Sequence, residues 1–333
     1  MLERPILRMM YQAAAMLLLP VYQRQLLRRP APQKMQTADA VFLSGDCETI
    51  LPNTLRREFP SLYQAHGFEC CSLLRKEDMA LLSTLRRRYP SAFYFRFKCM
   101  VKLAMYRYQY EVYHPKAMIV DEEYSYTSSF LTEYCHRLGV EHIDIMHGEK
   151  LYFIRDTFFC FDRCYVWDGY DLFCQLRAEP TQFRIELPPA MQPWDAQGVE
   201  KTVDYTYYLQ VETPQMLEKI AESLQKLRKN GAKVAVRPHP LYSDMEIVRR
   251  LFPDFEIEAN TEIGIETSIL RTRHVVGLYS TVLYQAHINH VPVVVDDLTD
   301  PERFTQLAEL KYMMLSLHHT LLSEITKSID ARR

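Results

Sequence analysis

From Ala40 onward, short apolar runs alternate with longer segments in which apolar residues recur at helical spacing. We expect strands at residues 40–44, 68–73, 117–120, 143–146, 163–167, 203–210, 233–237, 255–258, 274–277 and 291–295. The last of these runs is apolar throughout, which is typical of a strand that is covered on both faces. Such an alternation predicts α/β domains built on parallel sheets.

The clearest single unit is the strand–helix–strand pattern of residues 203–237. Thr213 and Pro214 supply an N-cap and a first-turn proline, and Gly231 follows the helix. One face of this helix is apolar and consists of Leu217, Ile220, Leu224 and Leu227. We therefore expect a right-handed crossover between two parallel strands.

Two further helices are expected in the first half of the chain. Residues 91–113 form an aromatic-rich segment whose apolar positions have helical spacing, and we interpret this stripe as core. A second helix is expected over residues 127–138, where Gly139 would provide a left-handed cap.

The whole pattern predicts two doubly wound, Rossmann-like α/β domains that face a central cleft. We expect an amino-terminal segment at 1–35, one domain at 36–190, another at 199–300, and a helical segment at 301–333. The segment 187–198 holds three prolines and marks the connection between the domains. One possible place for the helical segment after Pro301 is against the first domain, to which the chain would cross back.

The amino-terminal segment is basic around a short apolar run. Its basic residues are Arg4, Arg8, Arg24, Arg28, Arg29 and Lys34, against the single acid Glu3. The apolar run at residues 13–19 is far too short to span a bilayer, and the segment has no cleavage site of a signal peptide. Two interpretations remain open: a helix lying on an anionic membrane surface, and a helix packed on the protein with its arginines in water.

The composition is that of a soluble globular protein. The chain has 333 residues, of which 48% are hydrophobic and 25% charged, and its formal net charge of −2 gives no reason to expect a nucleic-acid partner. All eight cysteines lie within residues 47–174, mostly in apolar runs, which favours a reduced cytoplasmic protein. Cys160 and Cys164 have no second ligand pair with zinc-site spacing, so we expect no metal site.

Polar residues follow two strands of the second half at their carboxyl ends. Arg237, His239 and Pro240 end one strand, and prolines fix the backbone on both sides of the histidine. A histidine here is suited to donate to a phosphate oxygen, and the alternative interpretation is a turn histidine that caps its own loop. Arg237 has two possible roles, assisting that histidine or pairing with a carboxylate in the sheet.

Tyr279, Ser280 and Thr281 follow the second of these strands and lead into a helix at 282–290. One hydroxyl is the natural N-cap, and the N-terminus of such a helix binds phosphate without a cationic side chain. A simple cap is the alternative interpretation. The chain has no Gly-x-Gly-x-x-Gly and no Walker sequence, which argues against a dinucleotide or ATP site.

The first half offers candidates for a general base. His147 and Gly148 follow a strand, with Glu149 beside them, a pairing suited to abstract a proton from a hydroxyl. Asp46 stands at the end of the first strand and is expected to face the same cleft. Each of these residues, taken alone, is equally compatible with a structural role.

The order of these segments resembles that of GT-B glycosyltransferases that build bacterial capsule, lipooligosaccharide and wall polymers. That group includes sialyltransferases and Kdo transferases using CMP-sugars, and CDP-glycerol glycerophosphotransferases. The resemblance covers residues 40–300 by pattern and rests on His147-Gly148, Arg237-Pro-His-Pro240 and Tyr279-Ser-Thr281. It implies that His239, Pro240, Ser280 and Thr281 hold the nucleotide phosphate, and that the first domain supplies the acceptor site and the base.

The resemblance implies a metal-independent glycosyl or glycerophosphoryl transferase that uses a CMP- or CDP-linked donor and a glycan or glycolipid acceptor. Sialyltransferases often carry an acidic pair before the glycine, where this chain has Met146-His147, so the base is either His147 or a carboxylate such as Asp46. Two rival functions remain: a nucleotide-sugar epimerase of the same fold, and a non-catalytic partner in polysaccharide assembly. We expect a cytoplasmic protein, with peripheral attachment to the membrane if the amino-terminal helix binds lipid.

Overall fold

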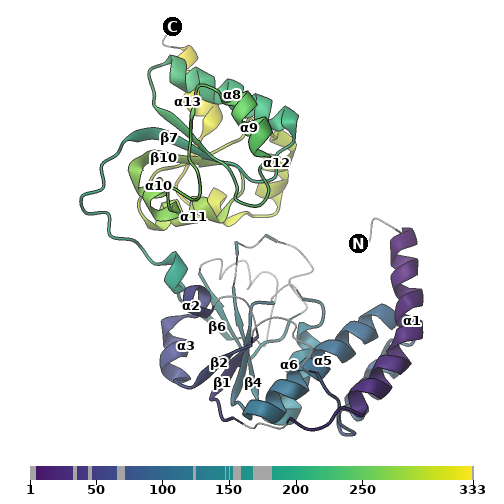
Figure 1. Cartoon of the computed structure of the whole chain (residues 1–333). Coiled ribbons are helices and arrows are strands. Elements are labelled where there is room, and N and C mark those ends of the chain that lie inside the picture. Colours follow the sequence, from purple (N-terminus) through teal and green to yellow (C-terminus); the bar gives the residue numbers. More distant parts are fainter. Residues whose placement is uncertain are drawn as a thin grey trace. The chain divides into compact units, whose positions relative to one another are not determined.

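The computed structural model describes residues 5–32, 36–43, 47–65, 72–122, 125–146, 148–149, 151–152, 159–167 and 182–331. The chain divides into two compact units (Figure 1). The amino-terminal unit comprises Met1–His147 and Phe153–Ala190, and the carboxyl-terminal unit comprises Gly148–Tyr152 and Met191–Arg333.

The amino-terminal unit is built on a parallel sheet with the strand order β2-β1-β3-β4-β5-β6. Its strands are β1 Ala40–Phe42, β2 Leu62–Gln64, β3 Ala117–Val120, β4 Glu141–Ile145, β5 Arg163–Val166 and β6 Gln182–Ile185. Its helices are α1 Pro5–Leu27, α2 Cys47–Ile50, α3 Asn53–Glu58, α4 Asp78–Arg88, α5 Phe93–Tyr113 and α6 Ser128–Leu138. Every residue of β1 and β3 is buried, as a doubly wound sheet requires.

Most of the expected elements of this unit are confirmed. Helix α5 and strand β3 lie where the pattern placed them, and α6 ends at Gly139, whose φ is 70°. The strand expected at 68–73 falls mostly outside the described residues, and the strand that pairs with β1 on its outer side is β2. Strands β2 and β6 escaped the sequence analysis because they are edge strands with exposed residues and no apolar run.

The carboxyl-terminal unit holds a second parallel sheet, with the order β12-β11-β10-β7-β8-β9. Its strands are β7 Val203–Tyr208, β8 Val234–Arg237, β9 Glu256–Ile257, β10 Thr272–Gly277, β11 Val293–Val295 and β12 Thr320–Leu321. Its helices are α8 Pro214–Lys229, α9 Met245–Leu251, α10 Ile265–Arg271, α11 Thr281–Ile288, α12 Pro301–Glu309 and α13 Leu322–Asp330, with 3-10 turns η2 Pro189–Met191 and η3 Met313–Ser316.

Helix α8 confirms the predicted crossover. Thr213 caps it by accepting a hydrogen bond from the Met216 amide (3.3 Å), and Pro214 is its first residue. Its four predicted apolar residues are buried, and they share a core with strand residues such as Val236 and Val276.

The segment after Pro301 belongs to the carboxyl-terminal unit. Strand β12 extends the second sheet beside β11, and α13 packs on α8. Leu322 and Ile329 of α13 are buried in the same core as α8. The amphipathic pattern of α13 therefore finds its partner inside this unit.

The strand order fixes where each sheet binds a ligand most readily. In the second sheet the chain runs outward from β7 to β9 and then returns to β10 on the other side of β7. The β7–β10 boundary is thus a topological switch point, and the crevice beyond its carboxyl ends is the usual ligand site of open α/β sheets. The β1–β3 boundary plays the same part in the first sheet.

Candidate functional site

Gln210 and Ser280 join across the switch point of the second sheet. Gln210 follows β7, Ser280 follows β10, and the Gln210 side-chain amide donates to Ser280 Oγ at 3.0 Å. Sequence analysis identified Ser280 but missed Gln210, which it placed at the end of a strand. The available signal was the polar pair Gln210 and Glu212 directly after an apolar strand.

Ser280 is the N-cap of α11, as predicted. Its Oγ accepts a hydrogen bond from the Val282 amide (3.2 Å) in addition to the one from Gln210. Because this oxygen accepts twice, its own O–H remains available to donate. Thr281, the first residue of α11, is half-buried beside it. The positive end of the helix and a free hydroxyl donor thus occupy the switch point together.

Tyr279 is held in an aromatic contact and is half-buried. Its ring packs edge-on against Tyr312 at a centroid distance of 5.0 Å, and the Arg303 guanidinium lies 5.6 Å from the ring centroid. These contacts fix the backbone that leads into Ser280. Tyr279 therefore positions the cap, whether or not it touches a ligand itself.

Glu212 is a carboxylate at the same strand end. Its two carboxylate oxygens accept hydrogen bonds from the Gln210 backbone amide at 2.7 and 2.8 Å, and burial raises the pKa of Glu212 to about 6. The bonds from the amide orient the Gln210 residue whose side chain reaches Ser280. Glu212 thus helps to hold Gln210 in place at the switch point.

His239 lies beyond the carboxyl end of β8, half-exposed. Its Nδ1 accepts a hydrogen bond from the Leu241 amide (3.1 Å), its ring stacks on Tyr242, and burial lowers its pKa. An Nδ1 acceptor requires that the neutral ring carry its proton on Nε2, which makes Nε2 a donor. Pro240, which follows, is exposed.

His239 and Ser280 extend from strands that flank β7. Neighbouring strands are spaced by about 5 Å, so these two strand ends are separated by roughly 10 Å. All three donors, His239 Nε2, the Ser280 hydroxyl and the α11 N-terminus, are neutral groups.

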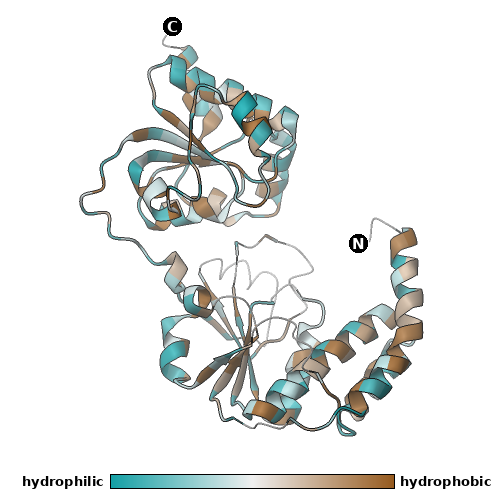
Figure 2. Ribbon diagram, in the orientation of Figure 1, coloured by the Kyte–Doolittle hydropathy of each residue, from teal (hydrophilic) through white to brown (hydrophobic). Residues whose placement is uncertain are grey.

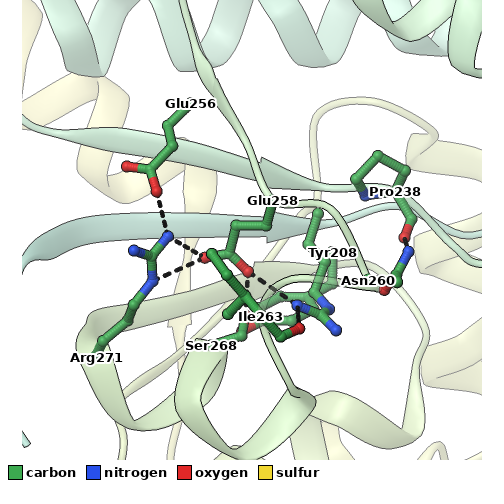
Figure 3. Close-up of polar contacts among 9 residues, drawn as sticks. Tyr208, Pro238, Glu256, Glu258, Asn260, Ile263, Ser268 and Arg271 are labelled. Atoms are coloured by element: carbon green, nitrogen blue, oxygen red, sulfur yellow. Dashed lines mark hydrogen bonds and ion pairs between the residues drawn. The ribbon is translucent and has the colours of Figure 1, made fainter.

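Of the two roles left open for Arg237, the structure shows pairing with a carboxylate of the sheet. Its guanidinium pairs with Glu258 (3.2 Å) and donates to the Ile263 carbonyl (2.8 Å), and its side chain is 7% exposed. Glu258 also binds Arg271 and Ser268, and Ser268 in turn lies 2.7 Å from the Tyr208 hydroxyl (Figure 3). The structure thus shows Arg237 Nη1 bound within the sheet, and a contact of Arg237 with the nucleotide stays a prediction.

The Asn260 side chain fixes the loop that carries His239. Its amide donates to the Pro238 carbonyl at 2.8 Å (Figure 3), and Ser243 Oγ accepts from the His239 amide at 2.8 Å. The histidine thus lies on a loop that is tied at two points. These two hydrogen bonds restrict the positions open to the His239 ring.

Of the three candidates for a general base, the structure describes Glu149. Asp46 and His147 lie outside the described residues. Glu149 belongs to the carboxyl-terminal unit, where burial raises the pKa of its carboxyl to about 8. At neutral pH this carboxyl is mostly protonated, so it donates a proton more readily than it accepts one.

No protein-family model matches the sequence, and no curated protein is significantly similar to it. Several solved structures resemble parts of the chain at low identity. HepE of Anabaena, solved with UDP and glucose, is 11% identical over 88% of this chain and 89% of HepE, with a TM-score of 0.47. The lipopolysaccharide outer core galactosyltransferase WaaB is 12% identical over 78% of this chain and 80% of its own, with a TM-score of 0.42.

TarM of S. aureus is 15% identical over 68% of this chain, with a TM-score of 0.43, and this chain covers 50% of the TarM chain. A TarM variant was solved with UDP. All these TM-scores are below 0.5, so the assignment of two doubly wound units rests on the strand orders described above.

Proposed function

We propose that this chain is a glycosyltransferase of the GT-B type. In this proposal the carboxyl-terminal unit holds the nucleotide of an activated donor, and the amino-terminal unit holds a glycan or glycolipid acceptor. The observation that carries the proposal is the donor set at the β7–β10 switch point, where Gln210, Ser280 and the α11 N-terminus meet.

The nucleotide is proposed to be a cytidylate, attached to a sialic acid- or Kdo-like sugar or to glycerophosphate. Support comes from the resemblance carried by His239, Ser280 and Thr281 to transferases that use CMP- or CDP-linked donors. HepE and TarM were solved with UDP, so a uridine donor is the competitor to be tested.

The reaction would be a direct displacement. An acceptor hydroxyl loses its proton to a base and attacks the transferred group. The bond from that group to the nucleotide phosphate breaks, and the phosphate leaves with the bonding electrons. His239 Nε2–H and the Ser280 hydroxyl donate to the phosphate as its charge grows. His147 and Asp46 are the proposed bases, because Glu149 is largely protonated at neutral pH.

Nucleotide binding tests this proposal directly. We expect CMP or CDP, at concentrations well above its dissociation constant, to raise the melting temperature of the wild-type chain. Ser280→Ala removes one hydrogen bond to the phosphate and should weaken binding roughly tenfold. The matched control is Asp300→Ala, because Asp300 caps a different helix, α12, by accepting from the Arg303 amide (2.9 Å) and is not one of the proposed phosphate donors.

Asp300→Ala should lose a cap, at a stability cost of about 1 kcal/mol, and keep nucleotide affinity. Equal loss of affinity in both variants would show that the loss of a helix cap, and not of a phosphate contact, weakens binding. A response to UDP alone would reject the cytidine donor and keep the transferase. No response to any of the three nucleotides would reject the site.

A further inference from the structure

Helix α1 is apolar on two sides, and only one of them is covered by the protein. On the covered side, Gln12 accepts a hydrogen bond from the Tyr94 amide of α5 (3.0 Å), and Tyr22 packs against Phe97. Ala15 and Leu26 are the buried residues of α1. Helix α1 therefore packs on the protein, as one of the two interpretations of its sequence required.

The other side of α1 exposes large apolar side chains to solvent. They are Ile6, Met9, Met10, Met16, Leu17 and Val21. Hydrophobic residues recur along the ribbon of this helix in Figure 2. Leu17 is 67% exposed and Val21 51% exposed, and helical spacing places Arg24 and Arg28 on the same side, one and two turns further on. An apolar stripe that ends in arginines is the arrangement of a helix lying at a membrane interface.

A groove of about 1100 Å³ between α1, α4 and α5 continues this surface. Its walls are mostly apolar, with side chains such as Leu19, Leu82 and Phe93. Its charged residues are all arginines, contributed by three helices: Arg24, Arg28, Arg86, Arg87 and Arg96. The arginines of α1 and of the last turn of α4 are far apart in the sequence, and only the fold joins them.

Arg96 shows that this groove lacks a counter-charge. Its residue is 9% exposed, and its guanidinium donates to the Pro90 carbonyl (2.7 Å) and lies 4.7 Å from the centroid of the Phe93 ring. Within the described part of the chain no carboxylate pairs with it. Burial, and after burial the nearby Arg86, lower the pKa of Arg96. An anion in the groove would offset both effects.

We propose that α1 and the last turn of α4 bind the surface of an anionic phospholipid bilayer. The exposed apolar side chains of α1 enter the acyl region, and Arg24, Arg28, Arg86 and Arg87 contact lipid phosphates. The proposal is independent of the proposed transferase function. It concerns the amino-terminal unit alone and requires no nucleotide.

Charge and length favour this occupant. Nucleic acid would satisfy the arginines but gains nothing from exposed methionine and leucine side chains. A second copy of the chain would bring arginines toward arginines. The uncharged stretch from Met9 to Gln23 is about 22 Å long as a helix, shorter than the roughly 30 Å hydrocarbon core of a bilayer. No helix in the described part of the chain is both long and apolar enough to span a membrane.

Flotation with vesicles of phosphatidylcholine, alone or mixed with phosphatidylglycerol, tests the proposal. The full chain should float with the mixed vesicles and stay behind with phosphatidylcholine alone, and added salt should weaken binding. Each arginine near an anionic surface contributes about 1 kcal/mol, so the double variant Arg86→Ser and Arg87→Ser should bind roughly thirtyfold more weakly. Leu17→Asp should also release the protein.

Two matched controls are available in the chain. Arg249 and Arg250 form an exposed pair on α9, and changing both to serine should leave binding unchanged. Ile185 of β6 is 66% exposed, so Ile185→Asp matches Leu17→Asp without touching α1. All variants should keep the wild-type melting temperature, and the arginine variant decides the result if Leu17→Asp does not fold.

Three outcomes would overturn the proposal. The first is equal binding to both kinds of vesicle, and the second is an equal loss in the α9 control. The third is a chain that does not bind vesicles but self-associates or binds oligonucleotides through Arg86 and Arg87. Loss of vesicle binding with unchanged nucleotide binding would locate the effect in the amino-terminal unit.

Discussion

His142 is fully buried in β4, and hydrogen-bonding groups surround both ring nitrogens. Nδ1 lies 2.7 Å from the Thr132 hydroxyl, and Nε2 lies 3.0 Å from the Tyr106 hydroxyl. Burial is the main cause that lowers its pKa from 6.5 to about 3. The folded protein therefore holds this ring neutral, whereas the unfolded chain protonates it near pH 6.5.

This difference predicts a pH dependence of stability. The contribution of His142 is complete above about pH 6.5 and is lost as the pH falls toward 3, at about 1.4 kcal/mol per pH unit. In urea unfolding, the wild type should lose more stability over this pH range than His142→Gln, because the variant lacks the His142 contribution. A Trp194→Phe background leaves Trp167, in the same unit as His142, as the fluorescent probe. Parallel pH profiles for the two proteins would contradict the prediction.

His239 yields a prediction about catalysis. If its Nε2–H stabilises the departing phosphate, His239→Ala should lower kcat by about 100- to 1000-fold and change the melting temperature little, because the ring is half-exposed. Transfer of labelled sugar from the donor that binds best is the measurement. Tyr242→Ala removes only the stacked ring and serves as the control. Full activity in His239→Ala would remove this residue from the mechanism.

At the scale of elements, the end of β9 is tied to β8 and α10 by a buried charge. Glu258 is 0% exposed and accepts hydrogen bonds from Arg237 and Arg271 (Figure 3). Removing one member of such a buried group leaves the others without their counter-charge, which costs far more than the loss of a surface ion pair. This pairing also fixes the loop that continues from β8 to His239.

Glu258→Gln should therefore lower the free energy of unfolding of the carboxyl-terminal unit by about 3 to 5 kcal/mol. The matched change is Glu256→Gln on the same strand, where the side chain is 51% exposed and pairs with the same Arg271. It should cost about 1 kcal/mol or less. Denaturant unfolding in a Trp167→Phe background, with Trp194 as the probe of this unit, measures both. Equal costs for the two variants would show that burial does not decide the effect.

At the scale of the whole molecule, both units follow the same rule. Each sheet is parallel and doubly wound, and each has a switch point beside its first strand. Apolar runs and helical spacing placed most elements correctly, and Gly139 and Pro214 marked helix ends, because capping is a local effect of adjacent residues. The sequence analysis did not predict the edge strands β2, β6 and β12, because the partly exposed residues of an edge strand form no apolar run.

The amino-acid sequence by itself determined the order of elements, the capping of α8 and α11, and the placement of His239 and Ser280 after buried strands. These follow from hydrophobic period and from residues that act on their immediate neighbours. Only the tertiary structure decided that Gln210 reaches Ser280, that Arg237 belongs to Glu258, and that the arginines of α4 join those of α1. Such partners lie far apart along the chain, and their choice depends on strand order and helix packing, which no local pattern records.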